Sequence, residues 1–438
     1  MKQWIWPSRW PGLKLIVDSG AFRWISRGRL PNPRIVIETQ RVLAAETGAL
    51  PVVLDHPVRS PLSAGEGEYG ASNEWTSKNS VMWQREFGDD YIYVLHAGSN
   101  TTLRRAVSTL RKTHPSVKYV GLGSLAPLSA RKPRKAIQIV EKARELLGDK
   151  HVHVFGVGNG LLALLAHTGL ADSVDTASHI IDASFGMARE PRTLSMVVVA
   201  GARERHKKRE ETWEELSKHC RCPICRTNPT LLARRGREGL IARAVHNAYW
   251  ILRAVRAPAV AKKMLSKRRL DKYLQGRGST PVCIVSCGKK KLGTPAPAQQ
   301  LYSGRFFRAQ ADAAMRICGS KWLILSAKHG LLMPEDYIDP YDEKAKNPQH
   351  LAEKIKPQVS ELGIERAISF LPRTYHLALR EILGDNARHI TGNPEGWKRP
   401  IGKIFQALKE IYERGFREFT RADASSFSNS LSSGTSSK

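Results

Sequence analysis

The stretch LKLIVDSGAFRWISRG, residues 13–28, decides the fold class of the first half of the chain. An apolar run over 13–17 ends on the carboxylate Asp18, and small residues follow at 19–21 before the aromatic Phe22. A short apolar run of this kind is typical of a buried strand. One interpretation is a strand that ends in a turn. The other is a carboxylate that points into a pocket with room for a flat ligand.

Further strand-like segments follow, and helical patterns separate several of them. The segments lie at 50–55, 91–96, 117–123, 151–156, 172–177 and 194–201. Repeated strand–helix units predict a parallel sheet. Seven or eight such units over about 200 residues favour an α/β fold of the (β/α)8 TIM-barrel type over an open sheet.

Polar residues and glycines cluster where these apolar strands end. They are Asp18, Asp55, His96, Gly123, Ser124 and Leu125, the run 156–158, and Asp175. In a barrel, the carboxyl ends of the strands form one face, and active sites are built there. Asp18 is therefore expected to be one of several groups that converge on one mouth.

The charge of the chain indicates a polyanionic partner. The 438 residues carry 70 Lys and Arg against 40 Asp and Glu, a formal net charge of +30. Such an excess attracts phosphate backbones, so nucleic acid is the favoured partner and a generally basic soluble protein is the alternative. No apolar run is long enough to span a membrane, and the start MKQWIWPSRWPG lacks the features of a signal peptide, so we expect a cytoplasmic protein.

Three cysteines in HCRCPICR predict a metal site. Cys220, Cys222 and Cys225 are followed 21 positions later by His246. Three thiolates and one imidazole suit tetrahedral Zn²⁺, and a closed four-ligand site is structural. His219 is a competing ligand, but it directly precedes Cys220, which makes its reach awkward. Clustered cysteines in a cytoplasmic chain favour metal over disulfides.

The composition divides the chain into four parts. We expect a barrel over 1–260 with a zinc-binding subdomain at about 202–255, and a basic linker over 261–280. A smaller α/β domain is expected over 281–416 and a Ser-rich disordered tail over 417–438. Whether the chain forms a homodimer is left open.

Two acids in one mouth can divide the work of group transfer. Asp18 and Asp175 follow different strands, so one can act as nucleophile and the other as general acid and base. An anomeric carbon is a natural target for a carboxylate nucleophile. For either acid alone, a turn or a helix cap is the commoner explanation.

The order of the motifs resembles that of the tRNA-guanine transglycosylases over roughly residues 13–255. The matching segments are VDSGAF, VVLDHP, VLHAGSNTTLRR, YVGLGSLAP, VFGVGNG, GLADSVDTASH and CRCPIC with its later histidine. The resemblance implies that Asp175 attacks C1′ of a guanosine and that Asp18 handles the N9 proton. It implies base contacts by Phe22 through stacking, by Asp55 at the guanine edge, and by His96, Gly123, Ser124, Leu125 and Gly158. It also implies zinc bound by the three cysteines and His246.

The chain departs from the family pattern around the base and not at the carboxylates. Ala21 replaces the second glycine of DSGGF, and His96 replaces the family glutamine. Ser124 replaces the second glycine of GGL, and Val174 replaces a phenylalanine. These changes leave the reaction type in place and put the identity of the base in doubt.

The second half resembles a small α/β domain of unknown function that is related to the YaaA-like DNA-binding proteins. The matching segments are CIVSCGKKK, LYSGRFF, LILSAKHGLLMPEDYIDPYD and PIGKIFQAL. Its strand-end lysines, which suit contacts to phosphate, are Lys289, Lys290, Lys291 and Lys328. For each lysine alone, a solvated basic loop is the commoner explanation.

The combination of the two halves resembles the DNA-guanine transglycosylases. We therefore expect exchange of guanine in DNA for a 7-deazaguanine such as preQ0, with the base flipped out of the helix. The first alternative is the same chemistry on tRNA. The second is a zinc-containing protein that binds nucleic acid without catalysis.

Overall fold

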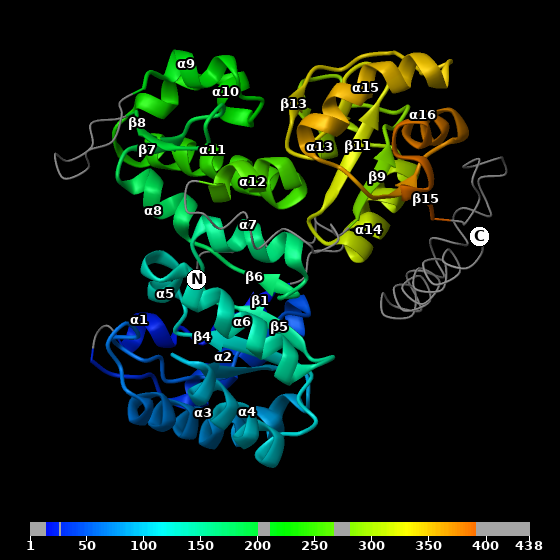
Figure 1. Cartoon of the computed structure of the whole chain (residues 1–438). Helices are drawn as coiled ribbons and strands as arrows, with labels where there is room; N and C mark the ends of the chain where they lie inside the picture. Colours follow the sequence, from blue (N-terminus) through cyan, green and yellow to red (C-terminus); the bar gives the residue numbers. More distant parts are fainter. Residues whose placement is uncertain (1–14, 26–27, 200–210, 267–280, 391–438) are drawn as a thin grey trace, which may run out of the picture. The chain divides into compact units, whose positions relative to one another are not determined.

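The computed structural model describes residues 15–25, 28–199, 211–266 and 281–390 (Figure 1). Its contacts divide the chain into two compact units. The first combines Met1–Phe185 with Ala261–Gly278, and the second combines Gly186–Val260 with Ser279–Lys438. The expected tail over 417–438 and most of the expected linker lie outside the described residues, and the domain boundaries stay predictions.

The first unit alternates strands with helices, as the sequence predicts. In chain order its elements are β1 (Ile16–Val17), α1 (Ala21–Ile25), α2 (Pro33–Thr47), β2 (Leu50–Pro51), α3 (Glu66–Phe87), β3 (Ile92–His96), α4 (Asn100–Thr113), β4 (Tyr119–Gly123), α5 (Ala126–Arg131), α6 (Pro133–Leu147), β5 (His151–Val154), α7 (Asn159–Thr168), β6 (Ser173–Val174) and α8 (Ser178–Ser184).

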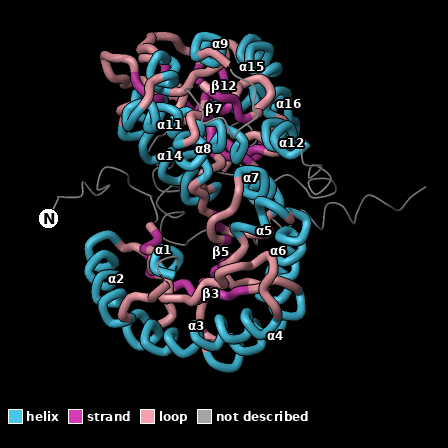
Figure 2. The backbone as a smooth tube through the Cα atoms, turned by 90° about the vertical axis from the view of Figure 1, so that its left-hand side faces the viewer, coloured by secondary structure: helices cyan, strands magenta, loops and turns pink. Residues whose placement is uncertain are grey.

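The strands of this unit run parallel and neighbour one another in chain order. β1 pairs with β2, a parallel bridge joins Val52 to Ile92, and β3, β4, β5 and β6 form one four-stranded sheet. In Figure 2 the helices α2, α3, α4 and α6 form a layer outside these strands. All carboxyl ends of the strands therefore meet at one edge, where the sequence places its polar residues.

The expected closed barrel of eight strands is not formed by the described residues. The parallel series there runs from β1 to β6, and the expected strand at 194–201 is instead β8 (Met196–Val198). It pairs antiparallel with β7 (Met187–Arg189) in the second unit. The link between β7 and β8 is too short for a parallel crossover, which needs a dozen or more residues.

Buried apolar faces hold the first unit together. Every residue of β3 is buried, as expected for a strand covered on both faces. α4 turns Leu103, Val107 and Leu110 inward at helical spacing. Its first turn is closed by Ser99, whose hydroxyl accepts the Thr102 N–H at 3.2 Å.

The second unit begins with a small metal-binding part. Its elements are β7, β8, α9 (Trp213–Lys218), α10 (Pro223–Thr227), a 3₁₀ turn (Pro229–Ala233) and α11 (Gly236–Arg256). α12 (Pro258–Ser266) follows α11 in the chain.

The rest of the second unit is an α/β domain with a mixed sheet in the order β12-β11-β9-β14-β15. Its elements are β9 (Val282–Ser286), β10 (Ala296–Pro297), α13 (Ala298–Leu301), α14 (Arg305–Cys318), β11 (Trp322–Ser326), β12 (Gly330–Leu332), β13 (Tyr337–Ile338), α15 (Pro348–Leu362), β14 (Ala367–Phe370), α16 (Arg373–Leu383), a 3₁₀ turn (Gly384–Asn386) and β15 (Ala387–His389).

Apolar residues on both faces of this sheet make two cores. Cys283 and Val285 of β9 pack on the side of α14, whereas Val282 and Ile284 pack on the side of α15 and α16. This alternation follows from the two-residue period of a strand, and it gives the sheet a helix layer on each face. No helix within the described ranges is long and apolar enough to cross a membrane.

Candidate active site and metal centre

Three carboxylates of the first unit lie beyond the carboxyl ends of parallel strands: Asp18 after β1, Asp55 after β2 and Asp175 after β6. The Asp18 pKa is raised, mainly because desolvation disfavours the charged carboxyl and then because of the charge on Asp55. The charge on Asp175 adds to this rise, while the N–H groups of Ser19 and Gly20 oppose it. Asp18 is exposed when the whole residue is counted, although its carboxyl is desolvated. The charges of Asp55 and Asp175 thus both act on the Asp18 carboxyl.

Asp55 is held by side chains from two other segments. Its Oδ2 lies 3.2 Å from His96 Nε2, and its Oδ1 accepts a hydrogen bond of 3.4 Å from the Ser19 hydroxyl. His96 is fully buried, and its Nδ1 lies 2.9 Å from Ser124 Oγ. The histidine that replaces the family glutamine thus contacts Asp55, and through that contact it can orient the carboxylate.

The two departures at 96 and 124 depend on each other. Ser124 has φ +60°, a conformation that favours glycine, yet its Oγ contacts His96 Nδ1 and accepts the Val58 N–H at 3.0 Å. Gly123 makes room for the imidazole, because a Cβ there would lie 2.7 Å from His96 Cε1. A histidine at 96 therefore requires glycine at 123 and gains a partner from serine at 124.

Asp175 is positioned by a second histidine and a backbone amide. Its Oδ1 lies 3.3 Å from His153 Nε2 and accepts the Gly156 N–H at 2.9 Å. His153 Nδ1 lies 2.8 Å from Ser173 Oγ, which also lies 2.8 Å from His151 Nε2. These contacts exist because His153 and Ser173 are register partners in β5 and β6. More than half of the Asp175 side chain is exposed, so the carboxylate can meet a ligand.

The remaining residues expected to contact the base surround the same strand ends. Leu125 is buried at the start of α5, and the Gly158 N–H donates to Ser129 Oγ of α5 at 3.2 Å. Gly123 ends β4. The side chain of Phe22 lies outside what the structure describes. The roles of all these residues in base binding stay predictions.

The sequence does not predict α3, which supports this edge of the sheet. Its buried face is polar and includes Asn73 and Thr76. The Asn73 side chain accepts the His96 N–H at 2.9 Å and donates to the His96 carbonyl at 2.8 Å. The Thr76 hydroxyl accepts the His56 N–H at 3.4 Å. A polar buried face hides the apolar periodicity by which a helix is predicted, and the signal that remains is Gly65 with Glu68 three positions later.

The second unit brings Cys220, Cys222, Cys225 and His246 together, as the sequence predicts. All four are buried, and their ligand atoms lie within 4.8 Å of one another. His246 Nδ1 is 3.6, 3.6 and 3.3 Å from the three sulfur atoms in chain order. Ligands around tetrahedral Zn²⁺ would place nitrogen and sulfur about 3.5 Å apart. The cluster could therefore hold a metal ion such as zinc.

Neighbouring groups orient the imidazole of this cluster. His246 Nε2 lies 2.7 Å from the Arg189 carbonyl oxygen of β7, so the ring donates its Nε2 proton there and leaves Nδ1 for a metal. The adjacent Asn247 bonds the Arg189 N–H at 2.9 Å and the Met187 carbonyl at 3.1 Å. α11 thus carries one candidate ligand and also fixes the strand that orients it.

The expected lysines of the C-terminal α/β domain differ in their surroundings. Lys289 and Lys290 are exposed. Lys291 Nζ lies 4.4 Å from the ring centre of Tyr341, and Lys328 Nζ lies 5.7 Å from the same ring. Both contacts are of the cation–π kind. The loops that follow β9 and β11 thus both contact the Tyr341 ring. The role of these lysines in binding nucleic acid stays a prediction.

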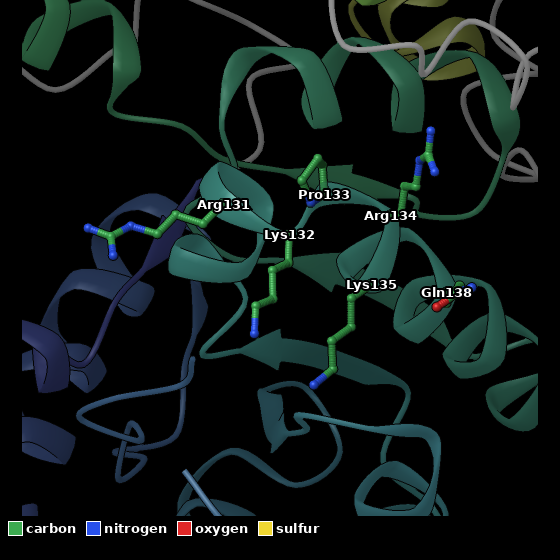
Figure 3. Close-up of a pocket in the computed structure, with 6 residues that line it drawn as sticks. All are labelled: Arg131, Lys132, Pro133, Arg134, Lys135 and Gln138. Atoms are coloured by element: carbon green, nitrogen blue, oxygen red, sulfur yellow. The ribbon is translucent and has the colours of Figure 1, made fainter. Parts of the chain in front are cut away.

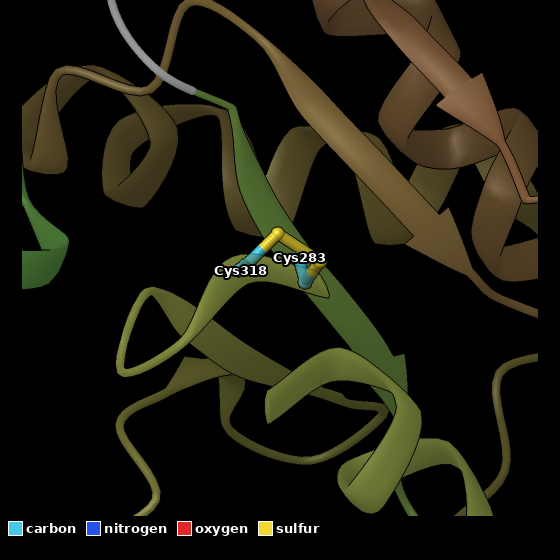
Figure 4. Close-up of a disulfide and its surroundings, with 2 residues drawn as sticks. All are labelled: Cys283 and Cys318. Carbon is cyan, nitrogen blue, oxygen red and sulfur yellow. A yellow bond between two sulfur atoms is a disulfide. The ribbon is translucent and has the colours of Figure 1, made fainter. Parts of the chain in front are cut away.

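A disulfide joins Cys283 of β9 to Cys318 at the end of α14 (Figure 4). The preference for metal over disulfides holds for the cluster at 220–225 and not for this pair. The two cysteines are 35 positions apart, and the sequence offers no sign that β9 and α14 bring them together. Cys287 is free, and its sulfur lies 3.8 Å from the Tyr375 hydroxyl.

Comparisons with known proteins find two families that match different parts of the chain. The family model described as queuine tRNA-ribosyltransferase matches residues 18–277, and the model of a family of unknown function (DUF6884) matches residues 282–409. The uncharacterized protein YfjM of Bacillus subtilis (strain 168) is 29% identical over 145 residues, which cover 30% of this chain and 95% of YfjM. The first model spans more than half of the chain and includes all three acids and the four candidate metal ligands. The chain therefore belongs to the queuine tRNA-ribosyltransferase family, whose members are pentosyltransferases that exchange guanine in nucleic acid.

Proposed function

We propose that the protein exchanges guanine in DNA for a 7-deazaguanine, preQ0 or a derivative, through a covalent intermediate on Asp175. The observation that carries this proposal is the convergence of three acids in unlike environments. Asp18 has a raised pKa, which favours a carboxyl that can donate a proton. Asp175 is held by a histidine and a backbone N–H, both of which suit an ionised carboxylate.

In the first half of the reaction, Asp175 forms a bond to C1′ as the bond from C1′ to N9 of guanine breaks. Oδ1 of Asp175 is engaged by His153 and Gly156, which leaves Oδ2 to attack. The electron pair of the broken bond goes to N9, and Asp18 supplies the proton there. The products are neutral guanine and a glycosyl ester on Asp175.

In the second half, the incoming 7-deazaguanine attacks C1′ through N9. Its N9 proton passes to Asp18, which the first half left ionised, and the ester bond to Asp175 breaks. Both carboxyl groups return to their starting states, so the exchange consumes nothing besides the two bases. One acid acting in both directions is general acid and base catalysis.

Asp55 is the proposed reader of the guanine-like edge of the base. Its Ser19 and His96 contacts would hold the carboxylate in one orientation while spare lone pairs accept N–H donors of the base. Gly123, Ser124, Leu125 and Gly158 would complete the base site, with Phe22 stacked on the ring. The cluster of three cysteines and His246 would bind a structural Zn²⁺, because four protein ligands leave no open position.

Two considerations support DNA over tRNA, although the family description names tRNA. The matched C-terminal family is of unknown function, and its domain carries the four strand-end lysines proposed to contact DNA phosphates. The resemblance of this two-part chain is to DNA-guanine transglycosylases. Exchange on tRNA is the alternative function, and binding without catalysis is the second alternative.

Base exchange with purified protein tests the proposal. The protein is incubated with preQ0 and with radiolabelled guanine in either duplex DNA or a tRNA transcript. We expect label to be released from the DNA and not from the tRNA. Release from tRNA alone would establish the alternative substrate. If no labelled guanine is released from either substrate while the protein still binds nucleic acid, the result would support binding without catalysis.

Asp175→Asn is the matched control for chemistry. It keeps the size of the side chain and removes the nucleophile, so it should abolish exchange and leave nucleic-acid binding close to that of the wild type. Retained turnover would remove Asp175 from the role of nucleophile.

A further inference from the structure

A basic hollow lies at the junction of α5 and α6 in the first unit (Figure 3). It is lined by Arg131, Lys132, Pro133, Arg134, Lys135 and Gln138. The four cationic residues are exposed, and among the residues that the structure describes none of them forms an ion pair with a carboxylate. In Figure 3 Lys132 and Lys135 project to the same side. We infer that this hollow binds a backbone phosphate of the nucleic-acid strand that enters the candidate active site.

The charge of the surrounding sequence is unusually one-sided. Residues 91–140 contain nine Lys and Arg and no Asp or Glu. Four of these nine cations fall within 131–135. A solvated helix face usually carries both positive and negative side chains. This run carries only positive ones, and the resulting positive potential attracts a polyanion.

The start of α6 adds to the attraction for an anion. α6 begins at Pro133, and no side chain caps its first turn. The unpaired N–H groups and the dipole of a helix N-terminus favour negative charge. The four cations and this helix end therefore act on the same hollow.

The hollow belongs to the same edge of the sheet as the three acids. α5 begins directly after β4 and is only six residues long, so its end lies about 9 Å along the helix axis from that strand end. Ser129 of α5 accepts the Gly158 N–H at 3.2 Å. Gly158 lies in the loop between β5 and α7, and Gly156 of this loop donates its N–H to Asp175. One short loop thus links the basic junction to the proposed nucleophile.

The chemistry of the lining indicates a phosphodiester and not a base. Lysine and arginine bind phosphate oxygens, and such contacts position a strand without reading its sequence. A base turned out of the strand toward Asp18, Asp55 and Asp175 leaves its flanking phosphates outside, close to this junction. The inference rests on the proposed function in that the bound strand is the substrate of the exchange.

The test measures binding of a fluorescent oligonucleotide by the full-length protein over a range of salt concentrations. Lys132→Gln and Lys135→Gln are made singly and together. Lys112→Gln is the matched control, because Lys112 is also exposed but lies in the last turn of α4, at the opposite end of the strands. Each single change at the hollow should lower the slope of log K against log salt by about 0.7 to 0.9, and the double change by about twice that.

Steady-state exchange gives a second measurement. The double variant should raise the KM for the nucleic acid and leave kcat and the KM for the incoming base unchanged. Lys112→Gln should leave all three constants and the salt slope unchanged. An equal change in salt slope and KM in the Lys112→Gln control would mean that only net charge matters, and it would overturn the inference. A salt slope equal to that of the wild type in the double variant would also overturn it.

Competition separates a strand from a free anion. Inorganic phosphate should displace the oligonucleotide no better than chloride of equal ionic strength, whereas unlabelled oligonucleotide should displace it fully. Specific displacement by phosphate would show that the hollow binds free phosphate, and it would overturn the inference that a nucleic-acid strand binds there. Because binding is measured also with Asp175→Asn, a failure of exchange and a failure of this phosphate site give different results.

Discussion

His153 Nε2 lies 3.3 Å from Asp175 Oδ1, and the same oxygen accepts the Gly156 N–H. Because an ionised carboxylate only accepts, His153 must donate through Nε2. His153 Nδ1 lies 2.8 Å from the Ser173 hydroxyl, which also lies 2.8 Å from His151 Nε2. The carboxylate is thus fixed at one oxygen by a chain of side chains from β5 and β6.

The first prediction concerns this donor. His153→Phe keeps a ring against Phe155 but removes the donor, so kcat should fall about tenfold to a hundredfold, the range expected for loss of one hydrogen bond to a charged group. His153→Gln can still donate and should recover part of the rate, with little change in KM. Equal rates for the two variants, measured by single-turnover base release, would exclude a role for the donor.

The second prediction concerns Asp18. Because the folded-state pKa is raised, ionised Asp18 destabilises the folded protein, and this cost is present only as the pH rises above the ordinary value of 3.8 through the folded value. Asp18→Asn should therefore abolish exchange and raise the Tm at neutral pH, with the gain vanishing near pH 3.8. Thermal unfolding over a pH series measures the difference in Tm between variant and wild type at neutral pH and near pH 3.8. A lower Tm at neutral pH would contradict the assignment of a raised pKa.

The third prediction concerns the metal. Cys222→Ser removes one of four buried ligands, so zinc content measured by elemental analysis should fall and soluble yield should fall with it. Cys287→Ser is the control, because Cys287 lies outside the cluster and should leave zinc content unchanged. A wild-type protein that is well folded without metal would refute a structural zinc ion.

The fourth prediction concerns the lysines near Tyr341. Lys291→Gln and Lys328→Gln should each lower the salt dependence of DNA binding by about 0.7 to 0.9 in slope if each neutralises one phosphate. Lys356→Gln on α15 is the control, because it is exposed and has no place in that group. Slopes that match the wild type for both test variants would remove these lysines from the DNA-binding surface.

Local sequence determined the strand ends and the metal cluster. Apolar runs that stop at Asp18, Asp55 and His96 mark where parallel strands end, because burial and turn formation depend on near neighbours. The spacing at 220–225 similarly places three thiols on one short turn. These features need no knowledge of how distant segments meet.

Tertiary structure alone decided the partners of those residues. The contact of His153 with Ser173 depends on the register of β5 and β6, and that of His96 with Ser124 depends on the pairing of β3 and β4. The contacts of the polar face of α3 and the disulfide between Cys283 and Cys318 also depend on tertiary structure. Each joins atoms distant in sequence, and such contacts arise from the packing of whole elements, whereas a strand end arises from the few residues around it.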